Sequence, residues 1–400
     1  MTDKNLNTKD NINISPSDWV KTTLGEVCEI KSGSTPSTKE ESFWNGEISW
    51  ITPKDLSNYN YVYISKGEKS ITQKGLKSSS VQLLPRNTIL FSSRAPIGYV
   101  AIAQNELTTN QGFKNLVCDE KRSHFRFFYY LLKEKSDHIE KLSSGSTFSE
   151  ASASVMRSIQ ISLPSLLEQQ VIASVLSAFD DKIELLREEN KTLEEIGKTI
   201  FKEWFGKYSV DKPEELPEGW RVGKLGEELT IKQGKYVKAE NLSEDKTEVK
   251  KYPIYGANGI RGYIDNYMYE EPKVVFGCRG LCGNPRISEK QSSITNTCMV
   301  LENEKSFLSS EFIYFLSKKI DFESVTSGSA QPQITITNLY SLEIIIPDQE
   351  TLKQFDEAIQ PIFRKIRDNS EQIQSLSHSR DELLPKLMSG VVRVNDFNKN

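Results

Sequence analysis

The sequence contains no long apolar run and few cysteines, and each of these shortages excludes a class of protein. No stretch of about eighteen consecutive apolar residues occurs, which excludes a membrane-spanning helix. The 5 cysteines accompany an N-terminus without an apolar signal core, so we expect reduced thiols in a cytoplasmic protein rather than a disulfide framework. A length of 400 residues with 37% hydrophobic side chains predicts two or three globular units with separate cores.

An excess of positive charge is also missing. A protein that binds nucleic acid by itself normally carries a clearly basic face, but the formal net charge here is -4. Residues 164–216 hold 7 Lys and Arg against 12 Asp and Glu, whereas residues 17–163 hold 18 against 15. If the chain binds DNA, we therefore expect a partner to supply much of the affinity for phosphate.

Catalytic and metal-binding motifs are lacking. An adenine methyltransferase needs Asn/Asp-Pro-Pro-aromatic, but Asn284-Pro285-Arg286-Ile287 lacks the second proline and the aromatic residue. No Walker sequence GxxxxGK[ST] and no convincing nuclease pattern occur. Cys278 and Cys282 could begin a zinc site, but no second Cys or His pair follows, so we interpret them as packing residues. The sequence predicts a binding protein without a metal or a catalytic centre.

The two halves of the chain repeat one pattern. Trp19 and the segment Leu24–Gly33 recur 201 positions later as Trp220 and Leu225–Gly234. The segment Phe91–Arg94 recurs at an offset of 185 as Phe276–Arg279, and Lys182-Ile183 recurs at an offset of 183 as Lys365-Ile366. The order is kept and the offset changes only by loop-sized steps, so we expect a duplicated architecture.

Each repeat has a front part whose sequence favours strands and a back part whose sequence favours one long helix. Its front part has β-branched and aromatic runs such as 48–52, 87–91 and 99–103, which favour strands, and one expected helix near 125–141 or 310–321. After Pro164 and Pro347, apolar residues recur at three-, four- and seven-residue steps, which predicts a long amphipathic helix of about 60 Å. Two such helices can cover each other's apolar stripes. Pro361 and Pro385 could kink or divide the second one.

Several segments in the expected order resemble the specificity subunits of type I restriction–modification systems. The resemblance runs from about Trp19 to Val394, and it is carried by Phe43–Gly46, Trp50–Leu56, Phe201–Phe205, Leu216–Trp220, Tyr252–Ile260, Ser327–Ile334 and Leu383–Gly390. It implies an α+β fold with two mixed α/β target-recognition domains, separated by two long, antiparallel paired helices in a pseudo-twofold internal repeat. The expected divisions are a disordered lead-in 1–16, recognition domain 17–164, helical spacer 165–208, linker 209–216, recognition domain 217–347, helical spacer 348–394 and tail 395–400.

The resemblance also implies the partners. Such a subunit reads a split target in double-stranded DNA, one half with each recognition domain, and its helices set the gap and dock two modification subunits. S-adenosylmethionine belongs to the modification subunit, and ATP and Mg to the restriction subunits that complete the nuclease. Two alternatives stay open: the specificity chain of a related system that cleaves on both sides of its site, and a helical scaffold that binds no DNA.

The candidate DNA-binding residues lie on turn-rich segments. Arg94 and Arg279 occupy equivalent places before glycine-bearing turns, where an arginine can contact guanine or clamp a phosphate, or simply bind loop carbonyls. Gln331, Gln333 and Thr335 offer groups suited to base edges, although a polar turn that caps a helix is an equal alternative. The remaining candidates, many of which could be ordinary surface residues, are Lys31, Lys54, Ser146, Thr147, Ser149, Lys232, Lys235, Tyr236, Asn258 and Arg261.

The apolar stripes of the two long helices are the expected docking surface for the modification subunits. The residues predicted to form it are Val175, Phe179, Ile183, Phe201, Trp204, Ile362, Ile366, Leu383 and Leu387.

Overall fold

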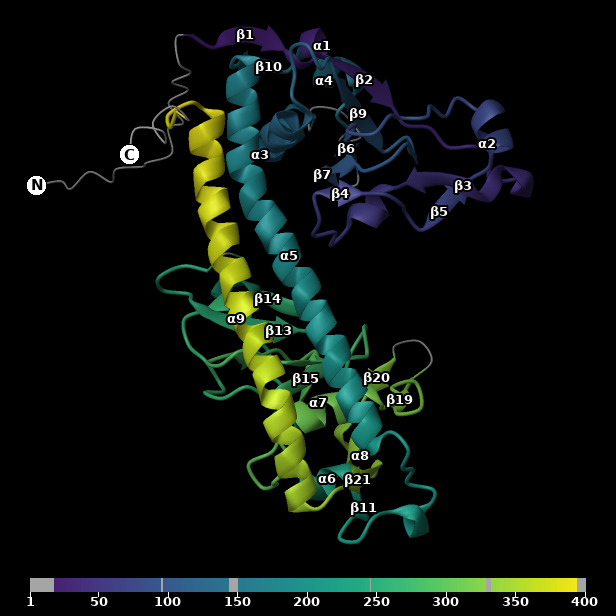
Figure 1. Ribbon diagram of the computed structural model, residues 1–400, viewed down its shortest axis with the longest axis vertical. Helices are drawn as coiled ribbons and strands as arrows, with labels where there is room; N and C mark the ends of the chain where they lie inside the picture. The colour runs from purple at the N-terminus through teal and green to yellow at the C-terminus, as the bar shows by residue number, and fades with distance from the viewer. Residues whose placement is uncertain (1–17, 95, 144–149, 245, 329–331, 394–400) are drawn as a thin grey trace, which may run out of the picture. The chain divides into compact units, whose positions relative to one another are not determined.

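The computed structural model describes residues 18–94, 96–143, 150–244, 246–328 and 332–393, which form two compact units (Figure 1). The first unit contains the chain up to Arg187 and again from Ser370, and the second contains Glu188–Asn369. Two helices of 40 residues, α5 (Leu166–Phe205) and α9 (Gln349–Met388), therefore contribute one half to each unit.

The head of the first unit contains two small sheets. One has the strand order β2-β9-β6-β7-β4 and the other the order β5-β3-β8. Neighbouring strands are antiparallel except for the pairs β4–β7 and β3–β8. The bounds are β2 (Cys28–Ser32), β3 (Trp44–Ile51), β4 (Tyr63–Ile64), β5 (Lys69–Ile71), β6 (Ile89–Ser93), β7 (Ile97–Ala103), β8 (Thr108–Thr109) and β9 (Phe113–Cys118).

The head of the second unit has the same strand orders, except that no described strand corresponds to β4. Its sheets have the orders β12-β18-β15-β16 and β14-β13-β17, and the pair β13–β17 is parallel, like β3–β8 in the first head. The bounds are β12 (Thr230–Gln233), β13 (Tyr252–Gly256), β14 (Gly259–Ile264), β15 (Val274–Gly277), β16 (Gly283–Ile287), β17 (Ser293–Ile294) and β18 (Cys298–Glu302).

A short antiparallel pair closes each head where its long helix begins. β1 (Val20–Thr23) pairs with β10 (Gln160–Leu163), and β11 (Arg221–Lys224) pairs with β21 (Glu343–Ile346). The indole of Trp19 donates to Glu168 at 3.2 Å, and that of Trp220 donates to Asp348 at 2.9 Å. The recurring tryptophans thus attach the start of each head to the start of a long helix.

Short elements complete the two heads. They are α1 (Leu24–Val27), η1 (Glu41–Phe43), η2 (Pro53–Leu56), α2 (Gln73–Lys77), α4 (Ala153–Ser158), η3 (Pro213–Glu215), α6 (Leu225–Glu228), η4 (Ala239–Asn241), β19 (Thr326–Ser327), β20 (Gln333–Ile334) and α8 (Ile336–Tyr340).

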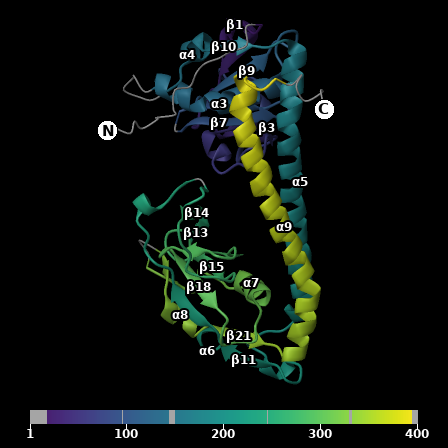
Figure 2. The ribbon, with the colours of Figure 1, turned by 90° about the vertical axis from the view of Figure 1, so that its left-hand side faces the viewer.

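One amphipathic helix per head joins the sheet to the long helices. In the first unit, α3 (Phe125–Ser143) buries Phe127, Phe128 and Leu131 in a core that also contains Ile172 of α5 and Leu387 of α9. Each fully buried side chain of this size stabilises the fold by about 1.5–3 kcal/mol. In the second unit, α7 (Ser310–Lys318) lies beside α9 (Figures 1 and 2), where rings of both helices pack together.

The structure contains most of the predicted elements, and it shows whether Pro361 and Pro385 divide the second long helix. The expected helices near 125–141 and 310–321 are α3 and α7, and the two long helices begin directly after Pro164 and Pro347 as predicted. Pro361 and Pro385 do not divide the second long helix, which is continuous. Gly390, with a φ of 71°, follows its end in the left-handed conformation typical of helix termination.

Candidate nucleic-acid interface

A glycine marks the place where two loops cross in each head. A Cβ atom on Gly33 would lie 1.8 Å from the carbonyl oxygen of Asn110, and one on Gly234 would lie 2.3 Å from that of Thr295. No side chain fits at these distances, so the recurrence of glycine 201 positions apart has a steric cause. The crossing brings the end of β2 or β12 against the turn that follows β8 or β17.

Backbone hydrogen bonds fix the same set of loops in both heads, which we call the loop frame. In the first head the bonds are Ser34 N to Thr109 O (2.9 Å), Asn110 N to Ile51 O (2.9 Å), Ser93 N to Gly112 O (2.7 Å) and Ala151 N to Ser93 O (2.9 Å). In the second head they are Lys235 N to Ile294 O (2.9 Å), Thr295 N to Tyr255 O (2.9 Å), Cys278 N to Thr297 O (2.8 Å) and Ile334 N to Cys278 O (3.0 Å). One scaffold therefore presents two different sets of side chains.

The two equivalent arginines stand in different electrostatic surroundings. Arg94 lies 3.7 Å from the carboxylate of Glu150, which also accepts from the buried Lys114 at 2.9 Å. Arg279 is exposed and faces Gln333 across an isolated antiparallel bridge. Within the described ranges Arg279 has no ion-pair partner. The charge of Arg279 is therefore available to a ligand, whereas that of Arg94 is partly neutralised.

Further candidates of the second head gather on its loop frame. Lys235 follows Gly234, and Tyr236 beside it is 73% exposed although tyrosine is largely apolar. Asn258 lies in the exposed turn between β13 and β14, and Arg261 is exposed on β14. Exposed cationic, amide and aromatic groups on one rigid set of loops can contact phosphates, base edges and unstacked rings.

Three lysine candidates are already engaged by acidic neighbours. Lys31 pairs with Glu29 at 3.3 Å, Lys54 with Glu68 at 2.8 Å, and Lys232 with Glu302 at 2.8 Å. The hydrogen bond that Lys54 donates to Glu68 raises the pKa of Lys54, and the one that Lys232 donates to Glu302 raises the pKa of Lys232. These contacts favour the interpretation that the three lysines are surface residues, so we rank them below Arg279.

Thr335 has a local structural role. Its side chain accepts from the backbone N–H of Asn338 at 3.2 Å and caps α8 at its N-terminus, which is the alternative that the sequence left open. Gln333 lies beside it on β20 and is half-buried. Ser146, Thr147, Ser149 and Gln331 lie outside the described residues.

Sequence reasoning missed polar side chains on the turn of the loop frame. In the first head, Thr35 donates to the exposed Gln111, and in the second the carbonyl of Asn296 accepts from the Gln233 side chain at 2.6 Å. Gln111 and Asn296 are related by the repeat offset of 185. Applying that offset to polar residues, and not only to recognisable motifs, would have found them.

The predicted docking residues point mainly toward the chain's own cores. Ile183, Phe201 and Leu387 are buried, and Val175, Trp204, Ile362 and Leu383 pack partly buried against the same cores. Phe179 and Ile366 are half-buried. The apolar periodicity therefore mostly marks the internal face of the helices, and docking of a partner on these residues stays a prediction.

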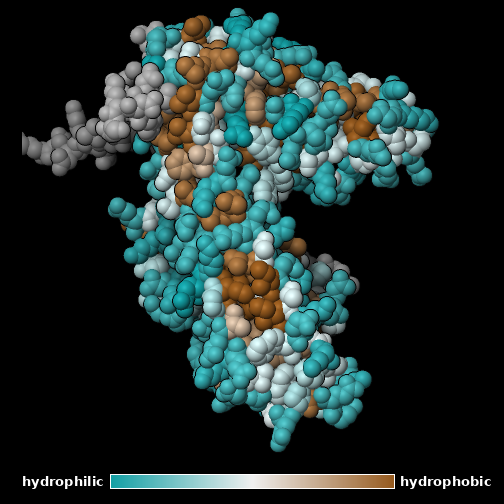
Figure 3. All heavy atoms as spheres, viewed as in Figure 1, coloured by the Kyte–Doolittle hydropathy of each residue, from teal (hydrophilic) through white to brown (hydrophobic). Residues whose placement is uncertain are grey.

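A second apolar stripe lies on the outer face of α5. At about 100° per residue, its members fall within about 40° of one another around the helix. They are Leu167 (71% exposed), Val171 (38%), Ala178, Leu185 (60%) and Ile196 (45%). In the space-filling view, apolar surface follows the course of α5 (Figure 3). The α9 residues at the offset of 183 are polar or proline: Glu350, Gln354, Pro361, Asp368 and Ser379.

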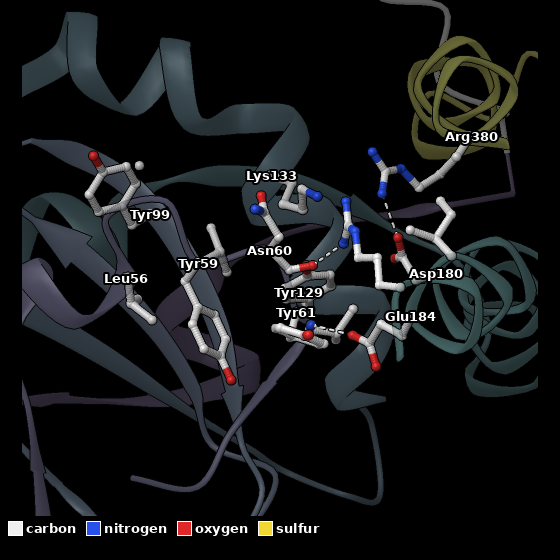
Figure 4. A pocket seen from close by; sticks show the side chains of 15 residues that line it. Leu56, Tyr59, Asn60, Tyr61, Tyr99, Tyr129, Lys133, Asp180, Glu184 and Arg380 are labelled. Carbon is white, nitrogen blue, oxygen red and sulfur yellow. Dashed lines mark hydrogen bonds and ion pairs between the residues drawn. The ribbon is translucent and has the colours of Figure 1, made fainter. Parts of the chain in front are cut away.

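A cavity of about 260 Å³ lies in the first unit between the head and the long helices (Figure 4). Its wall includes Tyr59, Tyr99 and Lys133 of the head together with Glu184 of α5. The Glu184 carboxylate accepts from the backbone N–H of Val62 at 2.6 Å, and burial raises the pKa of Glu184.

Within the part of the chain that the structure describes, no group of three or more His, Cys, Asp or Glu side chains is arranged to hold a metal. Burial, followed by the neighbouring Cys298, raises the pKa of Cys278 to about 11, so this thiol is poorly suited to bind a metal as a thiolate. None of the described helices combines the length and apolar character needed to cross a membrane.

Comparison with known proteins gives consistent matches along the chain. The type I restriction modification DNA specificity domain matches residues 16–195 and 217–377. The type I restriction enzyme MjaIX specificity subunit of Methanocaldococcus jannaschii is 37% identical over 96% of this chain and 95% of its own length. The EcoprrI specificity subunit of Escherichia coli is 27% identical over 82% and 83%. A crystal structure of the type I S subunit of M. genitalium shares the fold, with a TM-score of 0.57 and 22% identity over 96% of this chain and 98% of that one.

Proposed function

The chain belongs to the type I restriction modification DNA specificity family, and from this membership we propose that each of its heads reads one half of a split DNA target. The single observation that carries the proposal is the loop frame, which occurs in both heads with different side chains. A bipartite target needs two readers of the same shape but different chemistry, because direct readout depends on the side chains presented to the base edges.

In the second head, Arg279 is the principal candidate for base readout. It is exposed, free of ion pairs to described residues and held next to Gln333. An arginine can contact the two acceptors of guanine and a glutamine can contact adenine. Lys235 and Arg261 are exposed on the same head and would contact phosphates, which position a protein without selecting a sequence.

Co-expression with a modification subunit tests this function. Genome-wide mapping of methylated adenines should give a split motif with a fixed gap, and Arg279→Ala should change or weaken only the half that the second head reads. Lys290→Ala, which removes an exposed cation paired with Glu271, is the matched control and should leave the motif unchanged. An assembled, cofactor-competent complex whose methylation did not depend on this chain would contradict the proposal.

The two long helices are proposed to pair antiparallel and to set the gap between the half-sites. Contacts within each unit support this arrangement, because residue numbers fall along α9 as they rise along α5. In the first unit Asp180 pairs with Arg380, and in the second Glu189 lies 3.5 Å from Lys365 and Phe205 packs on Phe355 with ring centroids 5.1 Å apart. An antiparallel pair of equivalent helices, each following an equivalent head, would relate the two repeats by a pseudo-twofold axis.

The modification subunits are proposed to dock on the outer stripe of α5 as well as on the partly buried positions predicted from the sequence. An exposed apolar stripe on a charged helix is typical of a partner-binding surface. Leu185→Asp and Ile196→Ser give α5 the residues that α9 carries at the equivalent positions. Each should weaken binding of a purified modification subunit about tenfold or more, since burying a large side chain contributes about 1.5–3 kcal/mol.

The matched control for the docking surface is Val249→Asp, because Val249 is 71% exposed in the second head. It should leave affinity for the modification subunit unchanged. Equal loss of binding with Val249→Asp, or none with the α5 variants, would contradict the proposed docking surface. The proposal assigns no catalytic step to this chain: methylation with S-adenosylmethionine and the ATP-dependent steps with Mg belong to the modification and restriction subunits.

A further inference from the structure

Each unit contains a contact among three residues that the repeat relates to one another, yet the two contacts have opposite chemistry. One residue comes from the head helix, α3 or α7, and one comes from each long helix. The offsets of 185 for the head helices and 183 for the long helices pair Tyr130 with Phe315, Asp180 with Phe363, and Gly197 with Arg380.

The polar triad of the first unit consists of Tyr130, Asp180 and Arg380. The Tyr130 hydroxyl donates to one carboxylate oxygen of Asp180 at 2.5 Å, and the Arg380 guanidinium donates to the other. Figure 4 shows Arg380 extending from α9 toward Asp180 on α5. Asp180 is 4% exposed, and burial together with this carboxylate raises the pKa of Tyr130 well above its usual range. A carboxylate so deeply buried needs both donors.

The aromatic triad of the second unit consists of Phe315, Phe363 and Gly197. The two rings meet edge to face with centroids 5.6 Å apart, and both are buried. A Cβ atom on Gly197 would lie 2.7 Å from the Phe315 ring and 3.3 Å from Ile359. Glycine weakens a helix interior, so the close packing of Phe315 gives the physical reason for a glycine here.

Each triad draws its third residue from the other repeat. We call Trp19–Phe205 the first repeat and Trp220–Met388 the second. Tyr130 and Asp180 belong to the first repeat and receive Arg380 from the second. Phe315 and Phe363 belong to the second repeat and receive Gly197 from the first.

If two identical repeats paired, each triad would receive the wrong third residue. If the first repeat paired with a second copy of itself, Gly197 would replace Arg380 and leave the buried Asp180 without its cation. If the second repeat did so, Arg380 would replace Gly197, where the Phe315 ring leaves no room for a side chain, and the guanidinium would keep only its exposed neighbour Asp381 as an acceptor. Leaving the buried Asp180 carboxylate without its cation, as in the first case, is strongly destabilising.

We propose that the two triads form a pairing code that makes the repeats of this chain associate with each other and not with a second copy of themselves. The inference rests on the antiparallel helix pairing proposed above, and it is independent of which DNA sequence the heads read. It concerns a duplicated protein in particular, since two halves of the same fold could otherwise pair in three ways.

The test uses the full chain with a protease site inserted in the linker 209–216. Cleavage after folding leaves the two repeats joined only by their contacts, and mixing then allows exchange. The variant Lys182→Cys with Glu189→Cys reports pairing between two first repeats. Glu189 normally faces Lys365 of the second repeat, and the repeat offset makes Lys365 equivalent to Lys182. When two first repeats pair, position 189 of one copy therefore faces position 182 of the other, and the two cysteines can form a disulfide. Within one helix they lie about 10 Å apart, too far for a disulfide.

The cysteine pair is first combined with the substitutions Tyr130→Phe, Asp180→Phe and Arg380→Gly. These substitutions give both units the aromatic triad. We expect the 182–189 cross-link, identified by mass spectrometry of the joined peptides, to rise about tenfold or more over the unaltered triads. The reciprocal background, Phe315→Tyr with Phe363→Asp and Gly197→Arg, should raise it as well. Asp181→Ala, which removes an exposed carboxylate next to Asp180 in the sequence, is the control and should not raise the cross-link.

Correct folding is followed with a separate pair, Glu189→Cys with Lys365→Cys, which should cross-link the first repeat to the second in every background. An unchanged 182–189 cross-link in backgrounds that retain the 189–365 cross-link would overturn the pairing code. Loss of the 189–365 cross-link in both exchanged backgrounds would also overturn it, because the code requires each triad to be sufficient in either unit. Absence of the 189–365 cross-link with unaltered triads would instead contradict the proposed helix pairing.

Discussion

Arg279 and Gln333 face each other across an isolated antiparallel bridge, although they are far apart in the sequence. The bridge is continued by the hydrogen bond from Ile334 N to Cys278 O at 3.0 Å, so both side chains stand on a fixed backbone. In the first head, Ala151 and Ser93 make the equivalent bond at 2.9 Å, but there Glu150 lies close to the arginine. Readout by the two heads should therefore differ in its dependence on the arginine.

Arg279→Ala should weaken binding of the assembled complex to its target by about 1–3 kcal/mol if the guanidinium contacts a base. Binding should be measured at several salt concentrations on the true target and on one changed in the half-site of the second head. Arg279→Lys keeps the charge but not the two-pronged donor. Two results together would identify a phosphate contact instead: Arg279→Lys restores the binding affinity, and Arg279→Ala lowers the slope of log affinity against log salt concentration by about 1.

Thr335→Ala should lower stability and leave sequence preference intact. The lost N-cap of α8 costs about 1 kcal/mol, within a usual range of about 0.5–2. Thermal unfolding measures the loss, and Thr335→Ser, which keeps the accepting hydroxyl, should restore most of it. A changed methylation motif without a change in stability would show that Thr335 contacts DNA.

Alkaline pH should destabilise the second unit through Cys278. Burial raises the pKa of Cys278 to about 11 from the ordinary value of 9.0, so the folded state keeps a proton that the unfolded state loses. This contribution to stability is complete below about pH 9 and is lost as pH rises toward 11. Denaturant unfolding between pH 8 and 11 should show a steeper decline for the parent chain than for Cys278→Ala. Parallel declines would contradict the assignment.

Insertions should lengthen the gap between half-sites only when both long helices receive them. Asn369 donates to Asn190 at 2.9 Å and to Glu189 at 3.0 Å, so four residues inserted in α5 alone would shift it against α9. Four residues after Asn190 together with four after Asn369 add about 6 Å, enough for about 1–2 base pairs. The mapped motif should show the longer gap, and the single insertion should lower the melting temperature. An unchanged gap in a stable double-insertion variant would exclude the helices as the spacer.

The sequence by itself determined the duplication, the position of the long helices and the family. Spacing carries this information: glycine is required where loops cross at Gly33 and Gly234, and apolar residues recur wherever a helix faces a core. Arg94 and Arg279 could be found in the same way because they hold equivalent places in the repeat.

Only the tertiary structure decided which candidates are available to a ligand. Arg94 is partly neutralised by Glu150, 56 positions away, and Lys232 pairs with Glu302, 70 positions away, and no local sequence pattern predicts such pairs. Periodicity likewise shows that a helix has an apolar face but not whether that face is covered: Phe201, which was predicted for docking, is buried, whereas Leu185, which was not predicted, is exposed. The polar and aromatic triads could not be predicted either, because their members are distant in the sequence and come into contact only in the folded chain.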